Sequence, residues 1–137
     1  MENKKASSKA MNVALWVAQI FLAVSLIWAA WMKLFFPIDR LSALWPWTDQ
    51  IPLVLVKCSG MVDLLGAMGL ILPALFRVRQ RLVPMAAVAI VILMLCAGVF
   101  HVLRGEASVI GVNIVFAVVA GFVAWGRRKV GFRDSRN

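Results

Sequence analysis

The chain has 137 residues, of which 63% are hydrophobic and only 15% are charged, and its mean hydropathy is +0.89. This composition excludes an ordinary soluble domain and is typical of a protein that lies in a lipid bilayer. The 15 Lys and Arg residues against 6 Asp and Glu give a formal net charge of +9. Because most basic residues lie in short clusters outside the apolar runs, they are expected to orient membrane helices, and no nucleic-acid partner is expected.

The first apolar run extends from about Val13 to Phe36 and follows Lys4, Lys5 and Lys9. A signal peptide has a similar charged start, but its apolar segment is shorter. This run matches the roughly 20 residues that cross a bilayer, so it predicts a retained first transmembrane helix.

Three further apolar runs follow at about residues 52–75, 82–103 and 107–126, and each is long enough to span the hydrocarbon core. Pro37 closes the first run, Pro52 suits an early helical position, and Pro73 is expected to end the second helix before a basic turn. The sequence therefore predicts an all-α membrane protein with one domain over residues 1–137, a bundle of four transmembrane helices in contact with lipid.

The charges of the connections alternate along the chain. Basic residues cluster before the first run, between the second and third, and after the fourth (Lys4, Lys5, Lys9; Arg77, Arg79, Arg81; Arg127, Arg128, Lys129, Arg133, Arg136). The other two connections carry little net charge. The positive-inside rule then places both termini in the cytoplasm and predicts a multi-pass cell-membrane protein, with the bacterial inner membrane as the expected location.

Polar residues inside the spans gather toward the outer half of the predicted bundle, and the inner half is expected to be nearly all apolar. They are Lys33, Lys57, Asp63, His101 and Asn113. An ionisable group at the centre of a span costs on the order of 3 kcal/mol on insertion scales, so each needs a partner or a purpose.

These polar residues have simple structural interpretations as well as functional ones. Lys33 and Lys57 lie near enough to the interface to snorkel, whereas Asp63 is too deep and too short to do so. Asp63 is therefore expected to be neutral or paired with Lys33, Lys57 or His101, facing the bundle interior beside small residues. His101 either caps its helix end or contacts a polar group across the bundle, and Asn113 is most often a helix–helix hydrogen-bonding residue.

Cys58 and Cys96 are the only cysteines, and both are predicted in the outer half. They form a candidate redox pair, although lone helical cysteines are more often inert small apolar residues. The single histidine and the absence of clustered ligand spacing predict no metal site.

Several stretches in order resemble the DoxX-like family of small four-helix membrane proteins, over about Val13 to Arg127. They are Ala29-Ala30-Trp31-Met32-Lys33-Leu34, the segment from Gly60 to Pro73, the segments Pro84-Met85-Ala86-Ala87 and Met94 to His101, Asn113, and Trp125-Gly126-Arg127. The resemblance implies that Lys33, Asp63, His101 and, more loosely, Asn113 form a polar ligand-binding site. Two features depart from the family, which usually has Glu at the position of Asp63 and often Gly before Lys33.

Better-known relatives of this family are subunits of quinone-linked sulfur oxidation and of redox complexes handling thiols or oxidative stress, and some animal relatives assist other membrane proteins. The resemblance thus implies a redox-associated subunit that binds a quinone or similar lipophilic molecule beside a redox or other membrane protein partner. The alternatives are a small-solute or proton-coupled transporter, which would need a homo-oligomer, and an assembly factor without chemistry. No cofactor is visible in the sequence, and whether the chain is an enzyme stays open.

Overall fold

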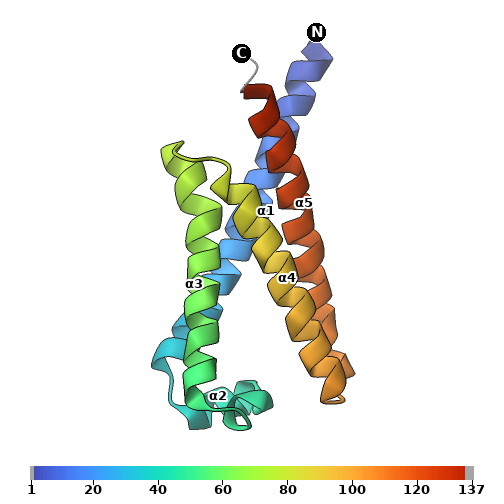
Figure 1. Cartoon of the computed structure of the whole chain (residues 1–137). Coiled ribbons are helices and arrows are strands. Elements are labelled where there is room, and N and C mark those ends of the chain that lie inside the picture. The colour runs from blue at the N-terminus through green and yellow to red at the C-terminus, as the bar shows by residue number, and fades with distance from the viewer. Residues whose placement is uncertain (1, 135–137) are drawn as a thin grey trace.

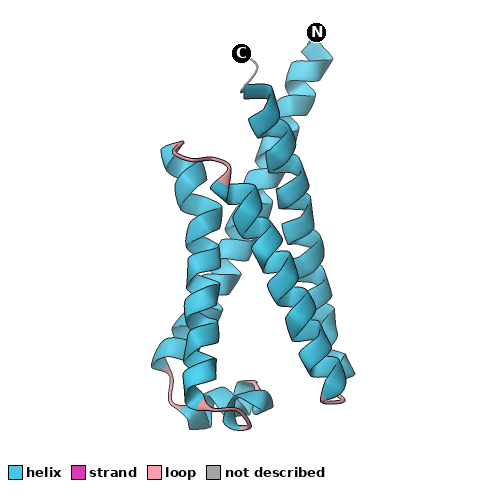
Figure 2. Ribbon diagram, viewed as in Figure 1, coloured by secondary structure: helices cyan, strands magenta, loops and turns pink. Residues whose placement is uncertain are grey.

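The predicted apolar runs form four long helices in the computed structural model, which describes the backbone of residues 2–134 and the side chains of residues 2–129. These helices are α1 (Glu2–Phe35), α3 (Leu53–Phe76), α4 (Leu82–Leu103) and α5 (Ile110–Asp134). Each is long and apolar enough to cross a membrane. The described residues contain no strand, as Figure 2 shows, so the predicted all-α class with four spans is confirmed.

The N- and C-terminal parts of the chain lie at one end of the molecule, together with the turn of residues 77–81 (Figure 1). We call this the terminal end. The opposite end carries the connection between α1 and α3, which folds into the short helix α2 (Ile38–Leu44) and the 3-10 helix η1 (Pro46–Asp49), and we call it the α2 end. An even number of spans thus brings both termini to one side.

The helices pack most closely in two pairs, α1 with α3 and α4 with α5. Helices α3 and α4 lie together near the turn of residues 77–81 and diverge toward the α2 end in Figure 1. The main apolar core joins all four helices and includes Leu22, Leu26, Leu70, Ile90 and Val123. The short segments α2 and η1 contribute to a second, smaller core around Met32, Leu41 and Val56.

The outer surface of the bundle carries many large apolar side chains. Val17, Leu65, Val99 and Val118, one from each long helix, are 60% exposed or more. Helices that are apolar on all sides belong in lipid, where outward-facing valine and leucine side chains carry no penalty. The structure therefore describes a multi-pass membrane protein.

The predicted helix ends differ from the structure at Pro73. This proline does not end the helix, because α3 continues to Phe76 with Pro73 inside it. A proline one turn from the end removes a single backbone hydrogen bond, which a helix tolerates. The helix ends at Arg77, whose backbone is left-handed with φ 55° and whose N–H donates to the Pro73 carbonyl. The prediction that Pro73 ends the helix was wrong by about one turn.

Two other segments also differ from the predicted boundaries. Helix α1 starts at Glu2, well before Val13, and a 3-10 helix, η2 (Ala107–Val109), precedes α5. The predicted connection of residues 38–51 is itself mostly helical in α2 and η1. Apolar runs mark the part of a helix that lies in lipid, and polar helical residues beyond it leave no such signal.

Helices α3 and α4 approach closely at Gly69. A Cβ atom built on Gly69 would lie 2.8 Å from the Ala86 Cβ, which is closer than two such atoms pack. Small residues at helix crossings let the two backbones approach closely. In lipid, where no hydrophobic driving force acts between helices, the resulting van der Waals packing holds them together.

We expect Gly69→Ala to lower the free energy of unfolding by about 1 kcal/mol, because the cost of overpacking exceeds the gain in helix propensity. The matched control is Gly121→Ala, since a Cβ on Gly121 meets no atom within 4 Å. Thermal unfolding in detergent measures both, and equal stability of the two variants would show that the α3–α4 crossing is not tightly packed.

The charge pattern predicts that the terminal end faces the cytoplasm. A fluorescent protein fused after Asn137 should fold and fluoresce in cells, and alkaline phosphatase fused after Gly105 should be active outside the cytoplasm. The reverse pair of results would invert the topology.

Candidate functional site

A buried ion pair joins the first two membrane-spanning helices. Lys33 on α1 donates from Nζ to Asp63 Oδ2 on α3 at 2.7 Å, and both side chains are mostly buried. Gly60, one turn before Asp63, permits this contact, because its missing side chain leaves room for the Lys33 Cβ. The structure thus confirms that Asp63 faces protein, and of the three candidate partners its hydrogen bond is to Lys33.

Two tryptophans of the α2 end cover the ion pair. The Lys33 ammonium lies 5.8 Å from the ring centroid of Trp45 and 5.7 Å from that of Trp47, which is the range of cation–π attraction. The turn that carries them is held by Thr48, which is fully buried and donates from its hydroxyl to the Trp45 carbonyl at 2.8 Å. The Trp-Pro-Trp stretch therefore shields the lysine charge as well as marking the membrane interface.

His101 pairs with Glu106, which lies in the short connection after α4. Helix α4 ends in a Schellman motif, in which Gly105 is left-handed with φ 74° and the Glu106 N–H donates to the His101 carbonyl at 2.9 Å. This cap turns the chain back, so Glu106 Oε2 lies 2.8 Å from His101 Nδ1. Local backbone geometry therefore creates the second polar pair.

Hydrogen bonds from His101 and Arg104 lower the pKa of Glu106 below its ordinary value. Because an ionised carboxylate only accepts hydrogen bonds, His101 Nδ1 carries the proton and donates it. Arg104 also donates to Gln50, beside η1, which ties the connection after α4 to the α2 segment. Polar contacts among Gln50, the C-terminal end of α4 and the connection that follows α4 thereby close the α2 end.

Aromatic rings lie between the two polar pairs. Trp47 packs edge-on against Phe100 with centroids 6.2 Å apart, and Phe100 packs in the same way against His101 at 5.5 Å. The predicted polar cluster is therefore divided into Lys33–Asp63 and His101–Glu106, and the described structure gives no hydrogen bond between them. The sequence contains no signal for this division, because Glu106 looks like an ordinary loop residue.

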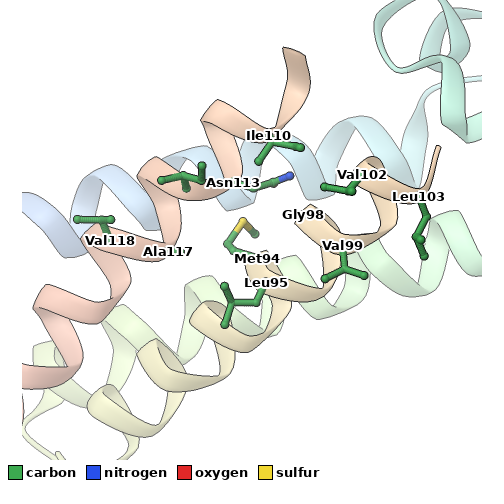
Figure 3. Close-up of a pocket in the computed structure, with 11 residues that line it drawn as sticks. Met94, Leu95, Gly98, Val99, Val102, Leu103, Ile110, Asn113, Ala117 and Val118 are labelled. Atoms are coloured by element: carbon green, nitrogen blue, oxygen red, sulfur yellow. The ribbon is translucent and has the colours of Figure 1, made fainter. Parts of the chain in front are cut away.

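Asn113 lies apart from both pairs, on α5. It lines a groove of about 550 Å³ between α4 and α5, drawn in Figure 3, and its Nδ2 is buried without a hydrogen-bond partner among the described residues. The rest of the lining is apolar, and the groove opens sideways, because Val99 and Val118 are 60% and 66% exposed. In a membrane that exposure is to lipid.

The remaining predicted residues lie on the outside of the bundle. Lys57 donates from Nζ to the Leu34 carbonyl at 2.8 Å, where a cation suits the C-terminal end of α1. Cys58 and Cys96 are both free and exposed, so the structure does not join them.

A polar network at the terminal end corrects the expectation that the inner half is nearly all apolar. Gln19 is fully buried, donates to the Leu70 carbonyl at 2.6 Å and accepts from Arg127 Nε at 2.6 Å. Arg127 also donates to Asn12 at 2.9 Å and lies over the Trp16 ring. The network links α1, α3 and α5. In the sequence, the only sign of this network was a glutamine, Gln19, inside the first apolar run.

The fold and these polar pairs define a small multi-pass α-helical membrane protein with an internally neutralised charge in its core. The DoxX-like family model matches residues 17–123, which is most of the chain, so the protein belongs to the DoxX-like family. This confirms the resemblance that the sequence motifs indicated. No curated protein and no solved structure matches the chain.

We expect Lys33→Met and Asp63→Leu each to cost about 3 kcal/mol of stability, because each leaves the other charge buried and unpaired. The double variant should recover most of that loss, since two apolar side chains replace the pair. Unfolding in mixed detergent measures the cycle. The control is Lys57→Met, whose partner is a carbonyl at an exposed position; additive losses in the double variant would contradict a coupled pair.

Proposed function

We propose that the protein is a redox-associated membrane subunit that binds a quinone or a similar lipophilic carbonyl compound in the groove between α4 and α5. The observation that carries this proposal is the buried, unpartnered Nδ2 of Asn113. A buried amide N–H without an acceptor costs about 1–3 kcal/mol, and lipid offers no water to satisfy it. A ligand carbonyl beside Asn113 removes that cost.

The shape and chemistry of the groove suit such a ligand. Its volume of about 550 Å³ lies within the range of small-molecule sites. Its lining combines an apolar wall with one hydrogen-bond donor, which matches a molecule with an apolar tail and a ring carbonyl. The opening toward lipid provides a route for a molecule that dissolves in the bilayer.

Gly98 contributes to the room inside the groove. A Cβ on Gly98 would meet no atom within 4 Å, so this position is open space. Figure 3 shows the Asn113 amide nitrogen reaching from α5 toward the side of α4 that carries Gly98. The donor and the open space therefore lie on facing helices.

The two polar pairs would support this function from nearby elements. The described hydrogen bonds of Lys33, Asp63 and His101 are all to other residues of the protein. Their part in ligand binding therefore stays a prediction. A bound quinone would supply the electron chemistry, and Asn113 would orient its ring carbonyl. The subunit would pass its ligand to a redox partner protein in the bacterial inner membrane.

We expect purified protein to retain about one quinone per chain in mass spectrometry of its extracted small molecules. Asn113→Leu should weaken binding about 3- to 10-fold, the value of one neutral hydrogen bond. Gly98→Leu should fill the groove and abolish retention while the Asn113 amide is still present.

The matched control is Gly121→Leu, because Gly121 is also a helical glycine with open space around it and lies outside the lining of this groove. Retention in Gly121→Leu together with loss in Gly98→Leu supports the site. Nothing above bulk lipid in the unmodified protein, or equal retention in all three variants, would remove the quinone proposal.

A further inference from the structure

The charges of the protein are divided unequally between its two ends. At the α2 end, four basic side chains stand with four acidic ones (Lys33, Arg40, Lys57, Arg104; Asp39, Asp49, Asp63, Glu106). At the terminal end, nine basic side chains of the described part stand with one acidic one (Lys4, Lys5, Lys9, Arg77, Arg79, Arg81, Arg127, Arg128, Lys129; Glu2). The α2 end is neutral and the terminal end is strongly cationic.

Internal ion pairs compensate charge at the α2 end alone. All three ion pairs of the described side chains, Lys33–Asp63, His101–Glu106 and Arg104–Glu106, lie there. At the terminal end Arg127 contacts two amide oxygens and an indole ring, which are neutral partners. The positive charge of this end is therefore not neutralised by ion pairs among the described side chains.

Tryptophan side chains indicate the depth of these cations in the bilayer. Lys129 Nζ lies 4.1 Å from the ring centroid of Trp125, and the Arg127 guanidinium lies 5.4 Å from that of Trp16. Tryptophan rings prefer the interface where lipid headgroups begin. The basic residues next to them therefore lie at the level of the lipid phosphates.

Two groups of exposed cations are available at this end. The turn after α3 carries Arg77, Arg79 and Arg81 within five residues, and all three are exposed. The last described side chains of α5, Arg128 and Lys129, are exposed as well. All five side chains are exposed and none takes part in an ion pair among the described side chains, so an anion can reach each of them.

We propose that the terminal end binds the phosphate groups of anionic phospholipids through these two groups, Arg77, Arg79 and Arg81 in the turn and Arg128 and Lys129 on α5. Basic residues at a membrane surface each contribute to attraction by anionic lipids. The binding is independent of the quinone groove, which lies between α4 and α5 in the other half of the bundle.

Native mass spectrometry of the detergent-purified chain tests this proposal, with phosphatidylglycerol and phosphatidylcholine of identical acyl chains as probes. The unmodified protein should bind phosphatidylglycerol preferentially. The turn variant Arg77→Gln/Arg79→Gln/Arg81→Gln and the helix variant Arg128→Gln/Lys129→Gln should each reduce that preference, by about fivefold for every cation that contacts a phosphate.

The control is Arg40→Gln, an exposed arginine at the α2 end, which should leave lipid preference unchanged. Circular dichroism of each variant checks that the helices are intact, as expected for substitutions at exposed positions. Equal binding of the two lipids, or a preference that survives both variants, would overturn the proposal. A loss in Arg40→Gln as large as in the helix variant would overturn it too.

Discussion

The constraint on which this structure depends is that polar groups inside a bilayer must find partners within the protein. Lys33 and Asp63, inside membrane-spanning helices, meet that constraint by contacting each other. Their contact requires Gly60, where α1 and α3 approach, and the covering rings of Trp45 and Trp47. Packing around Met32, Leu41 and Val56 and the contact of Arg104 with Gln50 hold η1 in the position from which its tryptophan covers this charge pair.

The same constraint separates structural polar groups from the candidate functional one. Lys33, Asp63 and His101 have partners, and Gln19 is satisfied from two sides. Two buried side-chain nitrogens of the described residues lack one. They are Arg127 Nη2, in the network at the terminal end, and Asn113 Nδ2, on a residue that lines the apolar groove. The proposed ligand would give the Asn113 donor an acceptor, whereas the Arg127 guanidinium already donates to Gln19 and Asn12.

The two ends of the bundle differ in how their charged side chains are balanced. At the α2 end acidic and basic side chains neutralise each other, and aromatic rings fill the space between the pairs. At the terminal end Arg127 is held by neutral groups, and most other cations are exposed. The groove between α4 and α5 therefore lies nearer the neutral end, and the cationic end lies on the opposite side of the bundle.

The sequence by itself determined the all-α class, the four spans and the family, because hydrophobic length and local motifs can be read along the chain. The partners were decided by the tertiary structure. Lys33 meets Asp63 across 30 residues and Gln19 meets Arg127 across 108, and Trp47 reaches Phe100 through the folded α2 segment. Such contacts depend on how helices rotate and cross, which is set by small residues and side-chain packing and leaves no periodic signal along the chain.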